Sequence, residues 1–476
     1  MKRKNKILKF KRSVVTRDLY ERRFHIKLAV AFRRFSEELS TLNTVKDWQK
    51  SHPKIKNVVL FVSDALRWDY LPEDVRSMGV TFKTVASGTF TAPSFASIIS
   101  GEYQPRHGVD SLYNGRLSSD GGTLLNLDGY NSSLWTQNIW TDFEPRTSAP
   151  IYTVLDLKNR VSLKDIKTPF IYLEDEKGGH CPYGLTSEDK ECKQANCQRF
   201  FRDLGGKGVK ELRERYKLSV KQSIDEFRNR LKIIEDRGLW DETLVIFLAD
   251  HGELLGEHGG LVGHETFSAP EIVYVPVVLI HPDLPKGVTC ENEGVLRHVD
   301  LYPTICNVIG RRIPAVDGLS LFDMEKLPDW GLSYYVEKSK RARAGKYTLE
   351  TIGLWDKDGG HVFRIGMNNF QRFLRSLYLT TFSDSLTATY QRQRIQHFPL
   401  RIVDNLRASS YCYKFHIKFG CPSLKKEEAR LIVEKTRMND NKFREKRRIV
   451  ETIRQMQGDT GIYRFGGATR GRENPS

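Results

Sequence analysis

Residues 243–253 read TLVIFLADHGE, a run of apolar residues that ends directly in an Asp-His pair. Such a short and almost wholly apolar run is typical of a strand buried on both faces of a parallel sheet. A helical pattern precedes it, with Gly238 as the helix terminator and an apolar face made of Tyr216, Val220, Ile224, Phe227, Leu231 and Ile234. A helix followed by a buried strand predicts a layered α/β fold.

Two other apolar runs, residues 57–63 and 169–174, have the same character. Each of the three predicted strands runs straight into polar residues: Asp64 after the first, residues 174–180 after the second, and Asp250 with His251 after the third. In open α/β sheets, ligands bind at the carboxyl ends of the strands. We therefore expect these three segments to converge on one crevice.

The net charge of +17 is carried by the two ends of the chain. Residues 1–57 have a net charge of +12 and residues 401–476 of +9, which leaves −4 for the middle. We divide the chain into a basic amphipathic N-terminal arm (1–56), a catalytic domain (57–325), a small C-terminal subdomain with strands at 346–352 and 361–365 (326–400), and a basic helical extension with a disordered tail (401–476).

The basic ends leave several partners open. The apolar stripe of the N-terminal arm, from Tyr20 to Leu42, could pack on the central body, on a second subunit or on an anionic membrane surface. The ends could also be solvated helix faces or bind another polyanion. We find no motif for specific recognition of nucleic acid, and the oligomeric state is not predicted.

Several absences limit the location of the protein. No apolar run approaches the roughly 20 residues that a membrane helix needs, and no cleavage site of a signal peptide follows the basic N-terminus. Seven cysteines at irregular spacing fit a reducing compartment better than a disulfide framework. We expect a cytoplasmic protein, either in bulk solution or peripheral to the membrane.

Three motifs together resemble the sulfatase family of the alkaline phosphatase superfamily. They are residues 62–67 (VSDALR), residues 88–101 (GTFTAPSFASIISG) and residues 248–259 (LADHGELLGEHG). Residues 180–183 (HCPY), 275–280 (VPVVLI) and 299–304 (VDLYPT) agree in the same order along the chain. The resemblance implies an alkaline-phosphatase-like α/β sandwich, with a central, mostly parallel sheet flanked by helices, a small C-terminal sheet and basic helical ends.

The resemblance also implies roles for particular residues. Thr91 stands at the position of the family's nucleophile, and Asp64, Asp250 and His251 stand at metal-ligand positions, so Thr91 is expected to bind the metal too. Two carboxylates and an imidazole suit a divalent ion such as Zn²⁺, Mn²⁺, Mg²⁺ or Ca²⁺. Coordination to such an ion would make a threonine hydroxyl a competent nucleophile toward phosphorus or sulfur.

Departures from the sulfatase pattern bear on the substrate. The family makes formylglycine from Cys or Ser, whereas position 91 is Thr; Phe95 replaces an Arg of the motif, and Ala65 replaces a second Asp. A Thr nucleophile is similar to the phosphodiesterase branch of the superfamily, which uses two metal ions. Candidates for a second metal or for substrate binding are Asp175, His180, His264, Ser94 and His258.

We therefore expect a metal-dependent hydrolase or transferase that cleaves or transfers a phosphoester group through a covalent Thr91 intermediate. One divalent ion is expected, and the spacing leaves a second ion open. The substrate would be an anionic ester. Two alternatives remain: a sulfuric ester hydrolase, and a catalytically silent scaffold that binds an anionic surface.

Overall fold

The computed structural model of the chain describes residues 42–51, 55–110, 117, 122–136, 160–184, 194–205, 208–264, 267–292, 294–338, 348–366, 368–383, 385–394 and 398–440. Most of the predicted N-terminal helix and the predicted disordered tail lie outside these residues. In the described part of the chain, we find no helix with the length and apolar character needed to cross a membrane.

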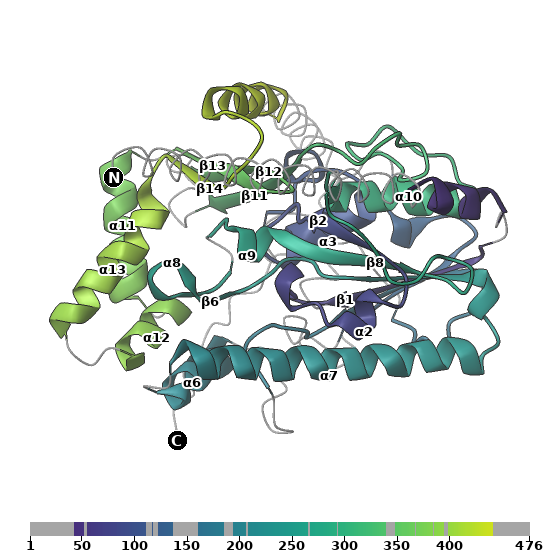
Figure 1. The fold of residues 1–476 in the computed structure, drawn as a ribbon, viewed down its shortest axis with the longest axis horizontal. Coiled ribbons are helices and arrows are strands. Elements are labelled where there is room, and N and C mark those ends of the chain that lie inside the picture. Colours follow the sequence, from purple (N-terminus) through teal and green to yellow (C-terminus); the bar gives the residue numbers. More distant parts are fainter. Residues whose placement is uncertain are drawn as a thin grey trace, which may run out of the picture.

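A mixed, mostly parallel sheet forms the centre of the molecule (Figure 1). Its strand order is β10-β2-β8-β5-β1-β4-β3, and β9 pairs with β2 beside this path. Strand β8 runs antiparallel to both of its neighbours, β2 and β5, while the other pairs are parallel. The strands are β1 (Asn57–Ser63), β2 (Val80–Val85), β3 (Asn131–Thr136), β4 (Phe170–Glu176), β5 (Thr243–Leu248), β8 (Tyr274–Ile280), β9 (Val288–Cys290) and β10 (Leu296–Arg297).

Both faces of this sheet are covered by helices, because β1 and its neighbours are apolar on both sides. Val59 and Phe61 pack with the residues of α7 (Val209–Asp236), whereas Val58 and Leu60 pack with those of α3 (Thr91–Ser100) and α10 (Leu301–Val308). Figure 1 shows α7 along one face of the sheet and α3 with α10 on the other. The predicted α/β sandwich is confirmed.

A second, antiparallel sheet has the order β11-β12-β13-β14. Its strands are β11 (Gly331–Lys338), β12 (Thr348–Asp356), β13 (Gly359–Ile365) and β14 (His416–Gly420). The two strands predicted at 346–352 and 361–365 correspond to β12 and β13. Three helices, α11 (Asn369–Thr381), α12 (Leu386–Arg394) and α13 (Phe398–Tyr413), lie between β13 and β14 in sequence and form one end of the molecule (Figure 1).

Short elements complete the fold. They are η1 (Trp68–Tyr70), α2 (Glu73–Arg76), α4 (Gln104–His107), η2 (Leu124–Asn126), α6 (Gln194–Leu204), η4 (Trp240–Glu242), β6 (Leu254–Gly256), α8 (Glu257–Gly260), β7 (Leu261–Gly263), α9 (Pro270–Val273) and η5 (His298–Asp300). Residues 42–51 and 426–440 are also helical.

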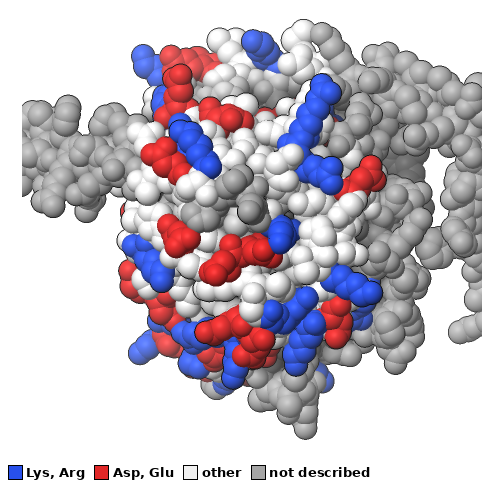
Figure 2. Space-filling view, turned by 90° about the vertical axis from the view of Figure 1, so that its right-hand side faces the viewer, with Lys and Arg blue, Asp and Glu red and all other residues white. Residues whose placement is uncertain are grey.

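The charged residues at one end of the molecule are of both signs. Figure 2 shows this end, the right-hand side of Figure 1, with Lys and Arg interspersed among Asp and Glu. Lys50 pairs with Asp47 at 3.2 Å, and Lys56 pairs with Glu242 at 2.6 Å. The basic character of the chain is therefore not gathered into one patch on the described part of this face.

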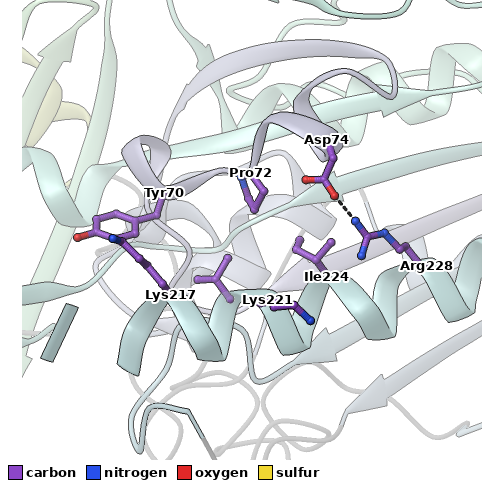
Figure 3. A pocket seen from close by; sticks show the side chains of 8 residues that line it. Tyr70, Pro72, Asp74, Lys217, Lys221, Ile224 and Arg228 are labelled. Atoms are coloured by element: carbon purple, nitrogen blue, oxygen red, sulfur yellow. Dashed lines mark hydrogen bonds and ion pairs between the residues drawn. The ribbon is translucent and has the colours of Figure 1, made fainter. Parts of the chain in front are cut away.

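A pocket of about 270 Å³ lies between the η1–α2 segment and α7 (Figure 3). Its walls include Tyr70 and Pro72 on one side and Val220 and Ile224 on the other, and Asp74 pairs with Arg228 at its edge. None of the residues predicted to be functional lines this pocket. The chemistry of the chain must be sought at the edge of the central sheet.

Candidate active site

The carboxyl ends of β1, β4 and β5 meet at one edge of the sheet, as the sequence predicts. Val62 pairs with Asp175 of β4 and with Leu248 of β5, so the residues that follow these strands emerge side by side. Asp64 follows β1 and Asp250 follows β5. This register brings together side chains that are about 185 residues apart in sequence, as the hydrogen bond between Ala65 and Asp250 records.

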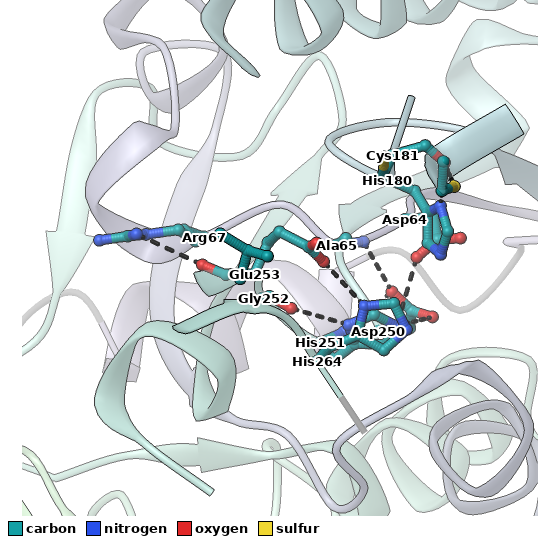
Figure 4. Close-up of polar contacts among 12 residues, drawn as sticks. Asp64, Ala65, Arg67, His180, Cys181, Asp250, His251, Gly252, Glu253 and His264 are labelled. Atoms are coloured by element: carbon teal, nitrogen blue, oxygen red, sulfur yellow. Dashed lines mark hydrogen bonds and ion pairs between the residues drawn. The ribbon is translucent and has the colours of Figure 1, made fainter. Parts of the chain in front are cut away.

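Asp64, Asp250 and His251 form a fully buried cluster (Figure 4). The Nε2 atom of His251 lies 3.3 Å from Oδ1 of Asp64 and 3.5 Å from Oδ2 of Asp250. Its Nδ1 atom is 2.8 Å from the carbonyl oxygen of Gly252, to which it donates. This backbone bond leaves the lone pair of Nε2 directed at the two carboxylates, the arrangement that a metal-binding histidine uses.

Backbone groups hold the carboxylates of this cluster in place. The amides of Ala65 and His251 both donate to Oδ1 of Asp250, at 3.1 and 2.9 Å. Its other oxygen, Oδ2, is buried and accepts no hydrogen bond from the described residues. A buried carboxylate oxygen without a donor is costly unless a cation neutralises it. The donor set therefore fits a divalent ion, and the three residues could hold one.

The loop after β4 fixes the backbone of Asp64. The amide of Asp64 donates to the carbonyl of Glu176 at 2.9 Å, and the amide of Gly179 donates to the carbonyl of Asp64 at 2.6 Å. Gly178, which lies between Glu176 and Gly179 in sequence, has a φ of +54°, and a Cβ there would lie 2.2 Å from the carbonyl oxygen of Asp64. Only glycine allows this close approach of two backbones.

A second group of side chains adjoins the first. Nδ1 of His264 lies 2.8 Å from Oε2 of Glu253, and the hydroxyl of Tyr183 donates to Oε1 of Glu253 at 2.6 Å. The rings of His251 and His264 are 4.3 Å apart between centroids. His251, Glu253 and His264 form the other group among the described residues whose atoms lie close enough to share an ion.

Burial controls the protonation of this second group. Desolvation raises the pKa of Glu253 and lowers the pKa of His264 well below its usual value. His180, whose ring centroid is 5.0 Å from that of His264, has its pKa lowered to about 3, mainly by burial. The two imidazoles are thus neutral at neutral pH and available as ligands or hydrogen-bonding groups.

Two predicted candidates lie elsewhere. Asp175 belongs to β4 itself rather than to the loop after it, accepts a hydrogen bond from Thr136 at 2.8 Å, and is in neither group that could share an ion. Nε2 of His258 lies 3.0 Å from Oε2 of Glu271, and the ring centroid of His258 is 5.0 Å from that of Tyr411 in α13. It has a φ of 52° within α8, which turns it toward the C-terminal helices.

Thr91 is the first residue of α3 and is only 7% exposed. Strand β2, which precedes it, runs parallel to β5 because β8 lies antiparallel between them, so both strands end at the same edge of the sheet. The amide of Ala86 donates to Val273, and that of Gly252 donates to the adjacent Ile272. The segment before Thr91 and the residue that follows the Asp-His pair are therefore anchored on neighbouring residues.

Ser94 lies in the first turn of α3. Its hydroxyl is fully buried and has no hydrogen-bond partner among the described residues. A Cβ on Gly88 would lie 2.9 Å from this hydroxyl, so the 88–91 segment packs directly on the helix start. Ser94 thus remains a candidate for contact with the substrate.

His298 links the two halves of the site, and its role was missed in the sequence analysis. Its Nδ1 accepts from the amide of Ser87 at 3.3 Å, and its Nε2 donates to the carbonyl of Ala249 at 3.0 Å. These partners lie four residues before Thr91 and one residue before Asp250. Burial lowers the pKa of His298 to about 3, which keeps the ring neutral and able to make both bonds.

Arg67 supports the loop that carries Glu253. Its guanidinium, only 7% exposed, donates to Asp69, to Glu257 at 2.8 Å and to the carbonyl of Glu253. The position of Glu253 in the Asp-His-Gly-Glu motif is the one signal that could have singled it out. Nothing local in the sequence identifies His298, because both of its partners are distant in the chain. Arg67 has one local partner, Asp69, but the partners that connect it to the Glu253 loop lie 186 and 190 positions away.

Comparisons with known proteins agree on one family. A family model described as Sulfatase matches residues 178–310. The chain is 36% identical over 313 residues to the low-salt glycan biosynthesis sulfotransferase Agl7 of Haloferax volcanii, a match that covers 64% of this chain and 74% of that protein. It is 32% identical over 150 residues to the multifunctional alkaline phosphatase superfamily protein PehA of Trinickia caryophylli, 29% of each chain.

Solved structures give weaker matches. A 2-O GAG sulfatase superposes with a TM-score of 0.49 and 16% sequence identity, over 66% of this chain and 83% of that one.

Proposed function

The chain belongs to the sulfatase family of the alkaline phosphatase superfamily, and from this premise we propose that it is a metal-dependent hydrolase or transferase acting through a covalent Thr91 ester. The substrate would be an anionic ester, with a phosphoester as the first candidate. One observation carries the proposal: the buried cluster of Asp64, Asp250 and His251 lies at the sheet edge where α3 begins with Thr91.

The donor set supports a divalent ion at this cluster. Asp64 and Asp250 would supply carboxylate oxygens and His251 its Nε2 nitrogen. Thr91 Oγ1 is proposed as a further ligand because its helix begins at the same edge of the sheet. When bound, such an ion neutralises charge on the ester and eases loss of the threonine proton. The neighbouring group of His251, Glu253 and His264 is the candidate place for a second ion or for contacts with the substrate.

The group-transfer step has two halves. Thr91 Oγ1 loses its proton and forms a bond to the phosphorus or sulfur of the ester, while the bond to the leaving oxygen breaks and that oxygen is protonated. In the second half, the oxygen of water or of an acceptor alcohol attacks the same atom. The bond to Oγ1 then breaks, and Thr91 regains a proton that the incoming hydroxyl gives up.

The start of α3 is suited to this chemistry. The N-terminus of a helix presents backbone amides that favour an anion, and Thr91 is the first residue of a ten-residue helix. The hydroxyl of Ser94, one position inside that first turn beyond Pro93, would supply a further donor. Both contacts would stabilise the acidic group while it is attached to Thr91.

Sulfuryl transfer to a glycan is the second candidate. It is favoured by the 36% identity to a protein named as a glycan biosynthesis sulfotransferase, over 74% of that protein. The Thr at position 91 is expected to escape conversion to formylglycine, so an alcohol-type nucleophile would form a sulfate ester in the same way as a phosphate ester. The acceptor, water or sugar hydroxyl, would then decide between hydrolysis and transfer.

Paired chromogenic substrates test the proposal. We would measure turnover of a phosphate monoester, a phosphate diester and a sulfate ester, each with Zn²⁺, Mn²⁺, Mg²⁺ or Ca²⁺ and with and without a sugar acceptor. Thr91→Ala should reduce turnover by roughly 10³-fold or more, as loss of a nucleophile does in other enzymes. Thr91→Ser, which retains a hydroxyl, is the matched control and should keep part of the activity.

Each substrate arm has a defined meaning. Turnover of phosphoesters that depends on Thr91 supports the first candidate, and sulfate turnover that depends on Thr91 and rises with acceptor supports the second. Full activity of Thr91→Ala on every substrate would refute the assigned nucleophile. Metal-independent turnover would refute the assigned ligands.

A further inference from the structure

Two helices at one end of the molecule turn apolar side chains to solvent. Along α11, the exposed residues recur every fourth position: Phe370 (68%), Leu374 (48%), Tyr378 (57%) and, at its C-terminal cap, Phe382 (64%). Along α13, the exposed residues are Leu400 (63%), Val403 (47%), Leu406 (40%) and Tyr411 (38%). We call these eight residues the outer apolar face.

The contact between the same two helices is polar. Thr380 Oγ1 lies 3.2 Å from the hydroxyl of Ser409, and Asn405 donates to the hydroxyl of Thr381 at 3.0 Å. On α11, Arg372 is buried and donates to the carbonyl of Arg364 at 2.6 Å. The amphipathic pattern of a water-exposed helix is thus inverted here, with polar groups inside and large apolar groups outside.

Exposed apolar side chains over a polar helix contact indicate a binding surface. Scattered single apolar residues on a surface need no explanation, but a continuous set on neighbouring helices marks an interaction site. The helices α11 and α13 pack on each other at this end of the molecule (Figure 1), and both present exposed apolar side chains.

Charge selects the occupant. Residues 369–418 contain eight Lys and Arg, of which Arg372 is buried, against two Asp and no Glu. Among them, three are exposed: Arg407 belongs to α13 itself, Lys414 follows the last residue of that helix, and Lys418 belongs to β14, which comes next in the chain. The combination of large apolar side chains with surrounding cations is typical of segments that lie in the interface of an anionic bilayer.

Other occupants fit this charge poorly. A second copy would bring the same basic surface against itself, and the N-terminal arm, with its net charge of +12 over residues 1–57, would also be repelled. The opposite end of the molecule has no comparable excess of basic residues on its described part, because its charges are of both signs (Figure 2). An anionic surface is the complement that the α11–α13 end requires.

This end contacts the segment that connects Glu253 and His264, two residues of the candidate active site. Gln391 of α12 donates to the carbonyl of Gly259 at 2.7 Å, and a Cβ on Gly259 would lie 2.8 Å from the amide of Ala408 in α13. Gly259 lies in α8, within the β6–α8–β7 segment that connects Glu253 to His264. Whatever the outer apolar face binds is therefore held at a fixed position relative to that segment.

We propose that the outer apolar face of α11 and α13 docks the protein onto an anionic lipid bilayer. Phe370, Tyr378 and Phe382 would insert between the headgroups, and the surrounding Arg and Lys would contact lipid phosphates or carboxylates. The attachment lies along the membrane surface, as for a peripheral protein. It does not depend on the proposed chemistry and is tested without it.

Flotation with lipid vesicles tests the docking. The full chain is mixed with vesicles of phosphatidylcholine alone or with phosphatidylserine or phosphatidylglycerol added, and the bound fraction is measured. We expect binding to the anionic vesicles that weakens as salt rises, since surface charges are screened within about 8 Å at physiological ionic strength. Equal binding to both kinds of vesicle, or to neither, would overturn the proposal.

Variants assign the binding to this face. The double substitution Phe370→Ser and Phe382→Ser should lower the vesicle partition coefficient by roughly tenfold or more, because it removes two large apolar side chains from the bilayer interface. Leu218→Ser and Leu319→Ser replace exposed leucines elsewhere (41% and 57%) and should leave binding unchanged. Circular dichroism spectra verify that all variants are folded.

The remaining outcomes discriminate between occupants. Undiminished vesicle binding by the double variant would overturn the proposal and point to the basic termini instead. A change from dimer to monomer in the double variant, with no vesicle binding by either protein, would identify the face as a contact between copies. Binding to an acidic protein but not to vesicles would likewise refute docking onto a lipid bilayer.

Discussion

Replacing His298 with leucine tests the link between the two halves of the site. His298 is fully buried and makes two hydrogen bonds, one to the amide of Ser87 and one to the carbonyl of Ala249. Leucine has a similar size but makes neither bond. Each buried group left unsatisfied costs about 1–3 kcal/mol, so the variant should lose about 2–6 kcal/mol of unfolding free energy at pH 7.5.

The pH dependence of this loss follows from the protonation of the ring. The pKa of His298 is lowered from 6.5 to about 3 in the folded protein, so below pH 6.5 the unfolded chain binds a proton that the folded chain does not. The contribution of this group to stability is thus present above pH 6.5 and decreases as the pH falls toward 3. Between pH 7.5 and 5.5 the wild type should lose about 1.4 kcal/mol from this group, which leucine lacks.

Urea denaturation at pH 7.5 and 5.5, followed by tryptophan fluorescence, measures both quantities. His281→Leu is the matched control, because His281 is also buried and bonded, to Trp48 at 3.2 Å, but follows β8 at the opposite edge of the sheet. Both variants should be less stable, whereas only His298→Leu should lower activity in the folded state. The unfolding free energies of the wild type and His298→Leu should differ less at pH 5.5 than at pH 7.5. An equal difference at the two pH values would refute the reasoning.

Three further changes probe the site. Gly178→Ala places a Cβ 2.2 Å from the Asp64 carbonyl oxygen and should weaken metal binding as measured by calorimetry. Gly238→Ala is the control: its φ is similar, +63°, but nothing lies within 4 Å of the new Cβ, so it should lower only the free energy of unfolding, by about 1–2 kcal/mol of backbone strain. Equal metal affinity in the two variants would contradict the role of the close approach at Gly178. Asp250→Asn should lower metal affinity by roughly 100-fold or more. A chelator should abolish wild-type activity until the metal is restored, and activity that persists in chelator would contradict the assigned ligands. Arg67→Met should destabilise the protein by roughly 1.5–3 kcal/mol, the range for a lost hydrogen bond to a charged group, because Glu257 keeps Arg213 as a partner but loses the buried Arg67. An unchanged midpoint of urea denaturation would argue against this ion pair.

The buried strands could be predicted from sequence because their signal is local. The apolar run 57–63 is β1 as observed, and the run that begins at Thr243 is β5, one residue shorter than expected. Since parallel strands share one edge, the meeting of Asp64 and Asp250 followed from these two strands alone. The positions of the main candidate ligands were therefore accessible without coordinates.

Features made by distant partners were not accessible. The antiparallel direction of β8 depends on its pairing with both β2 and β5. The role of His298 arises from hydrogen bonds to residues 211 and 49 positions away, and that of Arg67 from a bond to Glu257, 190 positions away. Asp175 was assigned to a loop because the predicted strand ends at position 174, yet β4 continues through Glu176 as it pairs with β1 and β3.

The C-terminal helices show a different limit. A helical period in Phe370, Leu374 and Tyr378 indicates an apolar stripe, but the period alone does not say which way the stripe faces. In the structure these residues are exposed, while Arg372, Ser376 and Thr380 are buried. Only the three-dimensional arrangement shows the inversion on which the docking proposal rests.

Mass spectrometry of the Thr91 peptide tests the central claim most directly. The wild type, Thr91→Ala and Thr91→Ser are incubated with an ester substrate and metal, quenched with acid, digested and analysed. The account predicts one added phosphoryl or sulfuryl group on Thr91 of the wild type, and accurate mass identifies which. Substrate turnover with no added group on this residue, or with the group on another side chain, would contradict it.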